Sequence, residues 1–184
     1  MKRIILVHGS PTKEEFLKNS TSPANAHWFP WLKEKAKNFN LNFFALDYPR
    51  PYDPIYEEWV NLFSTQIVDK NSILIGHSAG AGFLLRFLSE NRNIVVNKVI
   101  LVAPWLDPKK ELNTSFLEFS LDTTLDKRNN IFVFLSTDDD SDLIESFLII
   151  KKAFPDIHYL EYADKGHFCD KTFPEIITVI QSTD

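Results

Sequence analysis

The fold is decided by one stretch of the sequence, Ser72-Ile73-Leu74-Ile75-Gly76-His77-Ser78-Ala79-Gly80. Residues 72–75 form a short apolar run typical of a buried strand, and residues 79–89 have the apolar spacing of a helix. Between them lies G-x-S-x-G, the strand-to-helix turn that presents a serine hydroxyl. A side chain in place of either glycine would crowd the neighbouring strand and helix. We therefore predict that Ser78 is a nucleophile, against the alternative of a spectator serine in a glycine-softened turn.

Strands and helices alternate on both sides of this turn. Further apolar runs that predict strands cover residues 3–7, 41–46, 96–102, 131–135 and 157–162. They barely alternate with polar residues, as is typical of strands covered on both faces of a parallel sheet. The pattern predicts an α/β fold, a three-layer sandwich around a mostly parallel sheet of about six strands.

Local signals place helices between these strands. Pro30 suits the first turn of a helix that ends near residue 38. Three further helices are expected to begin at side-chain caps, which are Asp53, Asp142 with Glu145, and Thr172 with Glu175. Residues 10–26 and 103–130 lack regular signals. Both segments follow the carboxyl ends of strands, where open α/β sheets place their sites.

Composition limits the class of protein. The 184 residues, 44 % of them apolar, suit a single domain over residues 1–184. The formal net charge of −5 argues against a nucleic-acid partner, and no apolar run is long enough to span a membrane. Cys169 is the single cysteine, which excludes a disulfide framework and favours a reducing, cytoplasmic location. The glycines fit neither a dinucleotide fingerprint nor a phosphate loop.

A serine nucleophile needs a general base. In hydrolases with the G-x-S-x-G turn, called the nucleophile elbow, the catalytic residues follow the order serine, acid, histidine along the chain. The histidines that follow Ser78 are His158 and His167. His158 falls inside a predicted strand, whereas His167 lies in a loop just past that strand's carboxyl end. We therefore predict that His167 is the base. We expect His77 to face away from the chemistry and His27 to pack among aromatic residues, with lining of the cleft as its alternative role.

The acid should follow the strand at residues 131–135, where the sequence is Ser136-Thr137-Asp138-Asp139-Asp140-Ser141-Asp142. A small residue, two others and then aspartate is the usual spacing of this loop, which selects Asp139. Asp138 is the second candidate. The acid would hold the imidazole tautomer and stabilise the imidazolium. The alternating aspartates also begin like a calcium loop, but Leu143 and Ile149 replace the required glycine and glutamate, so we expect no metal.

Two backbone amides are expected to bind the oxyanion of the intermediate. One belongs to Ala79, the residue after the nucleophile, and the other to the loop His8-Gly9-Ser10 after the first strand. We choose the Ser10 amide as the second donor, with Gly9 as the alternative. In the segment 103–130, Trp105 is expected to bind substrate, and packing in the core is its alternative role.

Several motifs resemble those of the α/β-hydrolase superfamily: His8-Gly9, Gly76-His77-Ser78-Ala79-Gly80, Ser136-Thr137-Asp138-Asp139 and Gly166-His167-Phe168. The short chain is similar to one branch, the small serine hydrolases related to retinoblastoma-binding protein 9. That resemblance implies a minimal, lidless core, no cofactor, and a triad at Ser78, Asp139 and His167. The chain departs from this family in the acidic run 138–142, where a proline often follows the acid.

These observations predict a serine hydrolase that cleaves small carboxylic esters, with amides and thioesters as further candidates. The expected partner is a small-molecule substrate, without nucleic acid or membrane. Two alternatives stay open. One is an acyltransferase that uses the same acyl-enzyme, and the other is a non-catalytic protein-binding module on a hydrolase scaffold.

Overall fold

Six strands form one parallel sheet in the computed structural model, which describes residues 1–19 and 21–183. They are β1 (Arg3–Val7), β2 (Asn42–Ala45), β3 (Ser72–His77), β4 (Lys98–Val102), β5 (Ile131–Ser136) and β6 (His158–Tyr162). Their order is β2-β1-β3-β4-β5-β6, and each neighbouring pair is parallel. The predicted α/β fold is therefore confirmed.

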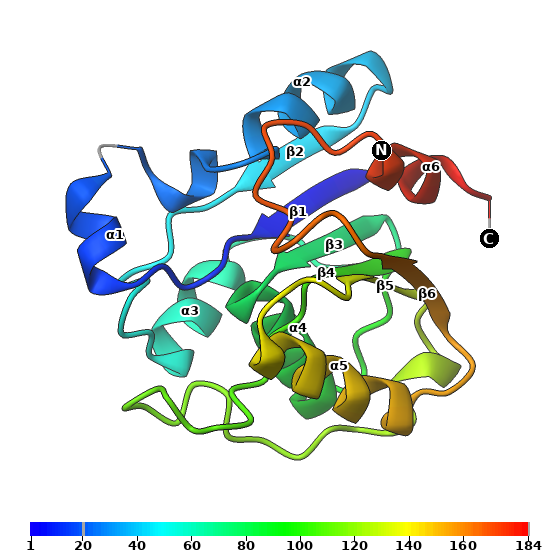
Figure 1. The fold of residues 1–184 in the computed structure, drawn as a ribbon. Coiled ribbons are helices and arrows are strands. Elements are labelled where there is room, and N and C mark those ends of the chain that lie inside the picture. The colour runs from blue at the N-terminus through cyan, green and yellow to red at the C-terminus, as the bar shows by residue number, and fades with distance from the viewer. Residues whose placement is uncertain (20, 184) are drawn as a thin grey trace.

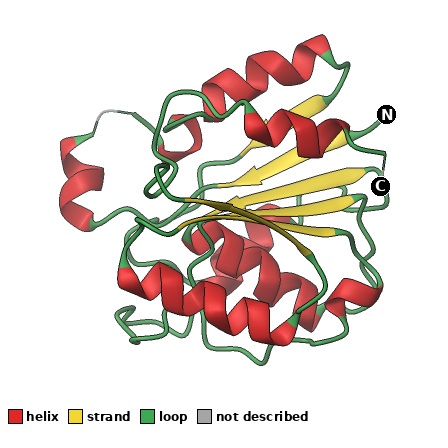
Figure 2. Ribbon diagram, turned by 45° about the vertical axis from the view of Figure 1, so that its right-hand side comes forward, coloured by secondary structure: helices red, strands yellow, loops and turns green. Residues whose placement is uncertain are grey.

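Helices cover both faces of the sheet, which gives three layers (Figure 1, Figure 2). One face packs against α2 (Phe29–Asn38) and α6 (Glu175–Gln181), and the other against α3 (Tyr56–Phe63), α4 (Ala79–Glu90) and α5 (Ser141–Ala153). Each face has its own apolar core. Strands β3, β4 and β5 are buried along their whole length, which explains why their sequences are continuously apolar.

The three predicted helix caps are wrong. No side chain caps α3, α5 or α6, whose N-cap positions hold Ile55, Asp140 and Pro174. The amide of Asp53 instead closes a turn by donating to the carbonyl of Arg50. Asp142 lies inside the first turn of α5, where its negative charge favours the helix amino terminus without capping it. Phe173 is buried in the core, so α6 begins only after it.

The segment 10–26 is not irregular as expected. It contains α1 (Lys13–Lys18) and a short 3-10 helix at Pro23–Asn25. A capping box starts α1, because the Thr12 side chain accepts the Glu15 amide and the Glu15 carboxylate accepts the Thr12 amide. The T-x-x-E signal was present in the sequence. In the segment 103–130 the described helical structure is one 3-10 turn, Leu125–Lys127, so no lid domain follows β4.

The turn from β3 to α4 is as crowded as its glycines predict. A Cβ at Gly80 would lie 2.4 Å from the carbonyl oxygens of Val7 and His8 at the end of β1. A Cβ at Gly76 would lie 2.5 Å from the Cα of Ala81. The first turn of α4 therefore rests directly on the backbone of β1.

We predict that Gly80→Ala destabilises the protein by more than about 3 kcal/mol, because the new Cβ must displace two backbone carbonyls. Gly166→Ala is the matched control. A Cβ there meets no atom within 4 Å, and only the left-handed backbone, with φ +47°, opposes it at about 1 kcal/mol. Urea unfolding of both variants measures the difference. Equal losses would show that the contact with β1 is not tight.

Candidate active site

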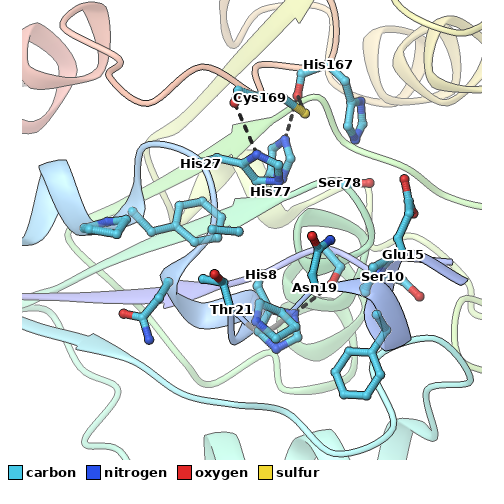
Figure 3. Close-up of a pocket in the computed structure, with 18 of the residues that line it drawn as sticks. His8, Ser10, Glu15, Asn19, Thr21, His27, His77, Ser78, His167 and Cys169 are labelled. Atoms are coloured by element: carbon cyan, nitrogen blue, oxygen red, sulfur yellow. Dashed lines mark hydrogen bonds between the residues drawn. The ribbon is translucent and has the colours of Figure 1, made fainter. Parts of the chain in front are cut away.

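A cleft of about 640 Å³ opens at the carboxyl ends of β1 and β3. The strand order reverses between these two neighbouring strands, and such switch points leave a crevice in open α/β sheets. Ser78 and His167 line the cleft together with the loop that follows β1 (Figure 3). The sequence-predicted nucleophile and base therefore lie in the same cavity.

Ser78 sits in a strained backbone conformation, with φ 55° and ψ −125°. Its amide donates to the Val102 carbonyl at 2.9 Å, and its carbonyl accepts the amides of Ala81 at 2.9 Å and Trp105 at 3.2 Å. Positive φ is costly for a residue with a side chain and persists only where surrounding contacts impose it. These contacts fix Ser78 at the turn, and its partly exposed side chain lines the cleft.

His167 is hydrogen-bonded to Asp139. The imidazole Nδ1 donates to Asp139 Oδ2 at 3.0 Å and lies 3.2 Å from Oδ1. The Asp139 side chain is 2 % exposed, whereas that of His167 is 32 % exposed. A buried carboxylate thus orients a ring whose Nε2 is left for the cleft. The alternative acid, Asp138, accepts the Gly166 amide at 2.9 Å instead.

Side chains from distant segments hold the loop that carries His167. Asp138 binds the Gly166 amide, and the hydroxyl of Ser136 accepts the Lys165 amide at 3.0 Å. On the far side of His167, the indole of Trp28 donates to the Phe168 carbonyl at 3.0 Å. The loop lacks regular structure, so these bonds replace those that a helix or strand would provide.

His77 also holds this loop, so the expectation that it faces away is wrong. Its Nε2 donates to the backbone carbonyl of His167 at 2.8 Å, and the two rings lie 4.8 Å apart. Complete burial keeps the pKa of His77 well below its usual value. His77 therefore stays neutral, with its proton on Nε2. His27 lies beside His77, as expected of a packing residue, but it also lines the cleft.

A second neutral histidine, His8, shapes the loop after β1. Its Nδ1 donates to the Gly9 carbonyl at 2.7 Å, and its Nε2 accepts the Tyr48 amide at 3.1 Å. Burial lowers the pKa of His8 to about 4. Sequence analysis gave this residue no role beyond the His8-Gly9 motif. Two buried imidazoles thus support the cleft without carrying charge.

The two predicted oxyanion donors are free to act. Among the described residues, no acceptor takes the Ala79 amide or the Ser10 amide. The loop carrying Ser10 runs close to the elbow, since a Cβ at Gly9 would lie 3.0 Å from the Cβ of Ser78. The Ser10 hydroxyl donates to the Pro51 carbonyl, which ties this loop to the segment after β2.

Trp105 does not line the cleft. It packs, partly buried, against the core on the α4 side of the sheet, and only its backbone amide touches Ser78. The wall opposite the elbow comes from the segment after β1 instead. Sequence analysis missed its lining side chains, which include Glu15, Phe16, Asn19 and Thr21.

Two features are absent from the part of the chain that the structure describes. None of its helices is long and apolar enough to cross a bilayer. It also holds no group of three or more His, Cys, Asp or Glu side chains placed to bind a metal ion.

The chain belongs to the serine hydrolase family, whose model matches residues 17–146. Serine hydrolase RBBP9 of Rattus norvegicus is 26 % identical over 187 aligned positions, which cover 94 % of this chain and 96 % of that protein. A protein of Bacillus subtilis (strain 168) described as a hydrolase, YdeN, is 32 % identical over 89 residues. That match covers 47 % of this chain and 42 % of YdeN.

Solved structures show the same fold. The ydeN gene product of B. subtilis superposes with a TM-score of 0.81 at 24 % identity, over 98 % of this chain and 97 % of that chain. Est1E of Butyrivibrio proteoclasticus superposes with a TM-score of 0.62 at 13 % identity, over 97 % and 84 %. Together with the family match, this makes the protein an α/β-hydrolase of the small serine hydrolase type.

We predict that the free energy of unfolding rises with pH between about 4 and 6.5. In this window the unfolded state protonates His8, whereas the folded state keeps it neutral, so acid favours unfolding. His8 alone accounts for about 3 kcal/mol across the window. His77 acts in the same direction. Urea unfolding at several pH values measures how steeply the free energy of unfolding rises with pH. This slope should be smaller for His8→Gln than for the wild type, and an equal slope would show that His8 does not cause the pH dependence.

Proposed function

We propose that the protein hydrolyses small carboxylic esters through Ser78, His167 and Asp139. The observation that supports this most directly is the hydrogen bond from His167 to the buried Asp139, in the cleft that Ser78 lines. Buried carboxylates cost free energy unless they serve a partner, and this one orients an imidazole beside a strained serine. A non-catalytic binding module would have no use for that arrangement.

The reaction begins when His167 Nε2 takes the proton of Ser78 and Oγ attacks the ester carbonyl. The amides of Ala79 and Ser10 bind the oxyanion of the tetrahedral intermediate. The imidazolium, stabilised by Asp139, then gives its proton to the leaving alcohol. Water, activated by His167 in the same way, releases the acid from the acyl-enzyme and restores Ser78.

Among the described residues, no hydrogen bond joins the Ser78 hydroxyl to His167. In free enzymes such bonds are often long and shorten when substrate binds. Figure 3 supports the pairing, because the ring of His167 hangs toward the Ser78 hydroxyl. We therefore propose that the Ser78 hydroxyl and His167 Nε2 come within hydrogen-bond distance when substrate binds.

Esters are favoured over amides because an alcohol leaves more easily than an amine from the tetrahedral intermediate; amides and thioesters would use the same residues. Esterases occur among the solved structures that share the fold. An acyltransferase would differ only in the acceptor of the acyl group. We further propose one domain over residues 1–184 in a reducing compartment such as the cytoplasm, which fits the exposed, unpaired Cys169.

We predict that Ser78→Ala abolishes esterase activity, with a loss of up to about a millionfold in kcat. The wild type should react with a fluorophosphonate probe, and the variant should not. Release of p-nitrophenol from p-nitrophenyl acetate measures the rate. A wild type that resists the probe, together with an active Ser78→Ala, would overturn the hydrolase mechanism.

We predict that Asp139→Asn lowers kcat about ten-thousandfold, because the amide no longer holds the Nδ1–H tautomer of His167. Asp138→Asn and Asp140→Asn are the matched controls and should cost little. Asn at position 138 still offers an oxygen to the Gly166 amide. A large loss in Asp138→Asn with Asp139→Asn near wild type would transfer the acid role to Asp138.

A further inference from the structure

The cleft contains a carboxylate that the proposed reaction does not use, that of Glu15. Glu15, Ser78 and His167 all line the cleft. In Figure 3 the Glu15 side chain extends from α1 toward the end of the cleft that holds Ser78 and His167. Its charge acts electrostatically on His167 and on His27, which lie across the cleft from α1. A negative charge outside the proposed triad therefore lines the same cleft as Ser78 and His167.

The start of α1 holds this carboxylate in place. Glu15 Oε2 accepts hydrogen bonds from the Thr12 amide and the Thr12 hydroxyl, both at 2.8 Å. These bonds hold the pKa of Glu15 below its usual value, so the group is ionised at neutral pH. Among the described residues, Oε1 has no hydrogen-bond or ion-pair partner. One oxygen fixes the group, and the other is available to a ligand.

Helix α1 itself is anchored beside the cleft. The ring of Phe16 lies 5.3 Å from that of Tyr52, and Ser10 binds the Pro51 carbonyl just ahead of the helix. The side chain of Phe16 lines the cleft next to Glu15. A lining that includes both an aromatic ring and a carboxylate suits an organic cation, because both groups attract positive charge.

Among the other described residues that line the cleft, we find no cationic side chain that is held in position as firmly as the Glu15 carboxylate and could offset its charge. Burial keeps His8 and His77 neutral. Lys171 also lines the cleft and is exposed, as Glu15 is, but among the described residues no hydrogen bond or ion pair restrains its ammonium. A flexible, hydrated lysine discriminates less than a carboxylate whose position is set by two hydrogen bonds.

We propose that Glu15 selects substrates that carry a cationic group, such as a substituted ammonium, a few bonds from the scissile carbonyl. The inference rests on the proposed function, because it names a substrate class for the same Ser78 site. Glu15 pairs with the cation and takes no part in proton transfer, so it determines specificity and leaves the chemical steps to the triad.

Matched esters that differ only in charge test this proposal. One pair is a choline ester and its neutral analogue, in which a quaternary carbon replaces the quaternary nitrogen. The second pair has the same replacement in the acyl chain instead. The ratio of kcat/KM within each pair is measured for the wild type, Glu15→Gln and Glu14→Gln. Glutamine keeps the capping box, so α1 stays intact.

Glu14 is the matched control because it precedes Glu15 in α1, pairs with Lys18 and does not line the cleft. We expect the wild type to prefer the cationic ester of at least one pair. Glu15→Gln should lower that preference about threefold or more, and Glu14→Gln should leave it unchanged. The preference should also weaken as ionic strength rises.

Two outcomes would overturn the proposal, and they differ in what they say of the enzyme. If Glu15→Gln leaves both ratios unchanged while Ser78-dependent hydrolysis continues, the specificity is wrong and the hydrolase function stands. If none of these esters is hydrolysed, the specificity is again wrong. Labelling of Ser78 by the fluorophosphonate probe then decides whether the hydrolase function falls with it.

Discussion

The contact between Gly80 and the end of β1 is the constraint on which both the fold and the site depend. Because the first turn of α4 rests on the carbonyls of Val7 and His8, α4 must begin directly beside β1. Ser78 is thereby fixed next to Gly9, and the loop that carries Ser10 reaches the same end of the cleft. The strand order, which places β1 beside β3, makes this contact available. The packing that closes the core therefore also positions Ser78, the proposed nucleophile, and the neighbouring amides.

The loop that carries His167, the proposed general base, depends on a different kind of support. Its loop has no regular structure, and side chains from β3, β5 and the segment before α2 bind its backbone. His77 links the two halves of the site, since it belongs to the elbow and holds the carbonyl of His167. A charged His77 would carry a proton on each ring nitrogen within a buried space, and desolvation opposes that. Burial of this imidazole thus keeps the site in one arrangement.

Features that give a periodic pattern or a motif in the sequence could be predicted. Features that depend on tertiary contacts, such as the exact start of a helix or the side of the sheet on which a ring packs, could not. The strands were predictable because burial on both faces leaves continuous apolar runs. The pairing of His167 with Asp139 followed from residue order and loop spacing. The start of α6 did not, because burial of Phe173 overrides the cap signal at Thr172. The position of Trp105 after a strand could not show on which side of the sheet its ring packs.

The proposed catalytic residues and the residues of α1 that line the cleft belong to different parts of the structure. The proposed triad and oxyanion donors extend from β1, β3, β5 and β6, where backbone contacts tolerate little change. Helix α1 buries none of its residues, and one capping box and the Phe16–Tyr52 contact hold it beside the cleft. Substitutions in this helix outside its capping box cost little stability, since surface changes away from caps and core are nearly neutral. If Glu15 has the proposed role, the lining that α1 contributes can therefore vary while the sheet keeps Ser78, Asp139 and His167 in place.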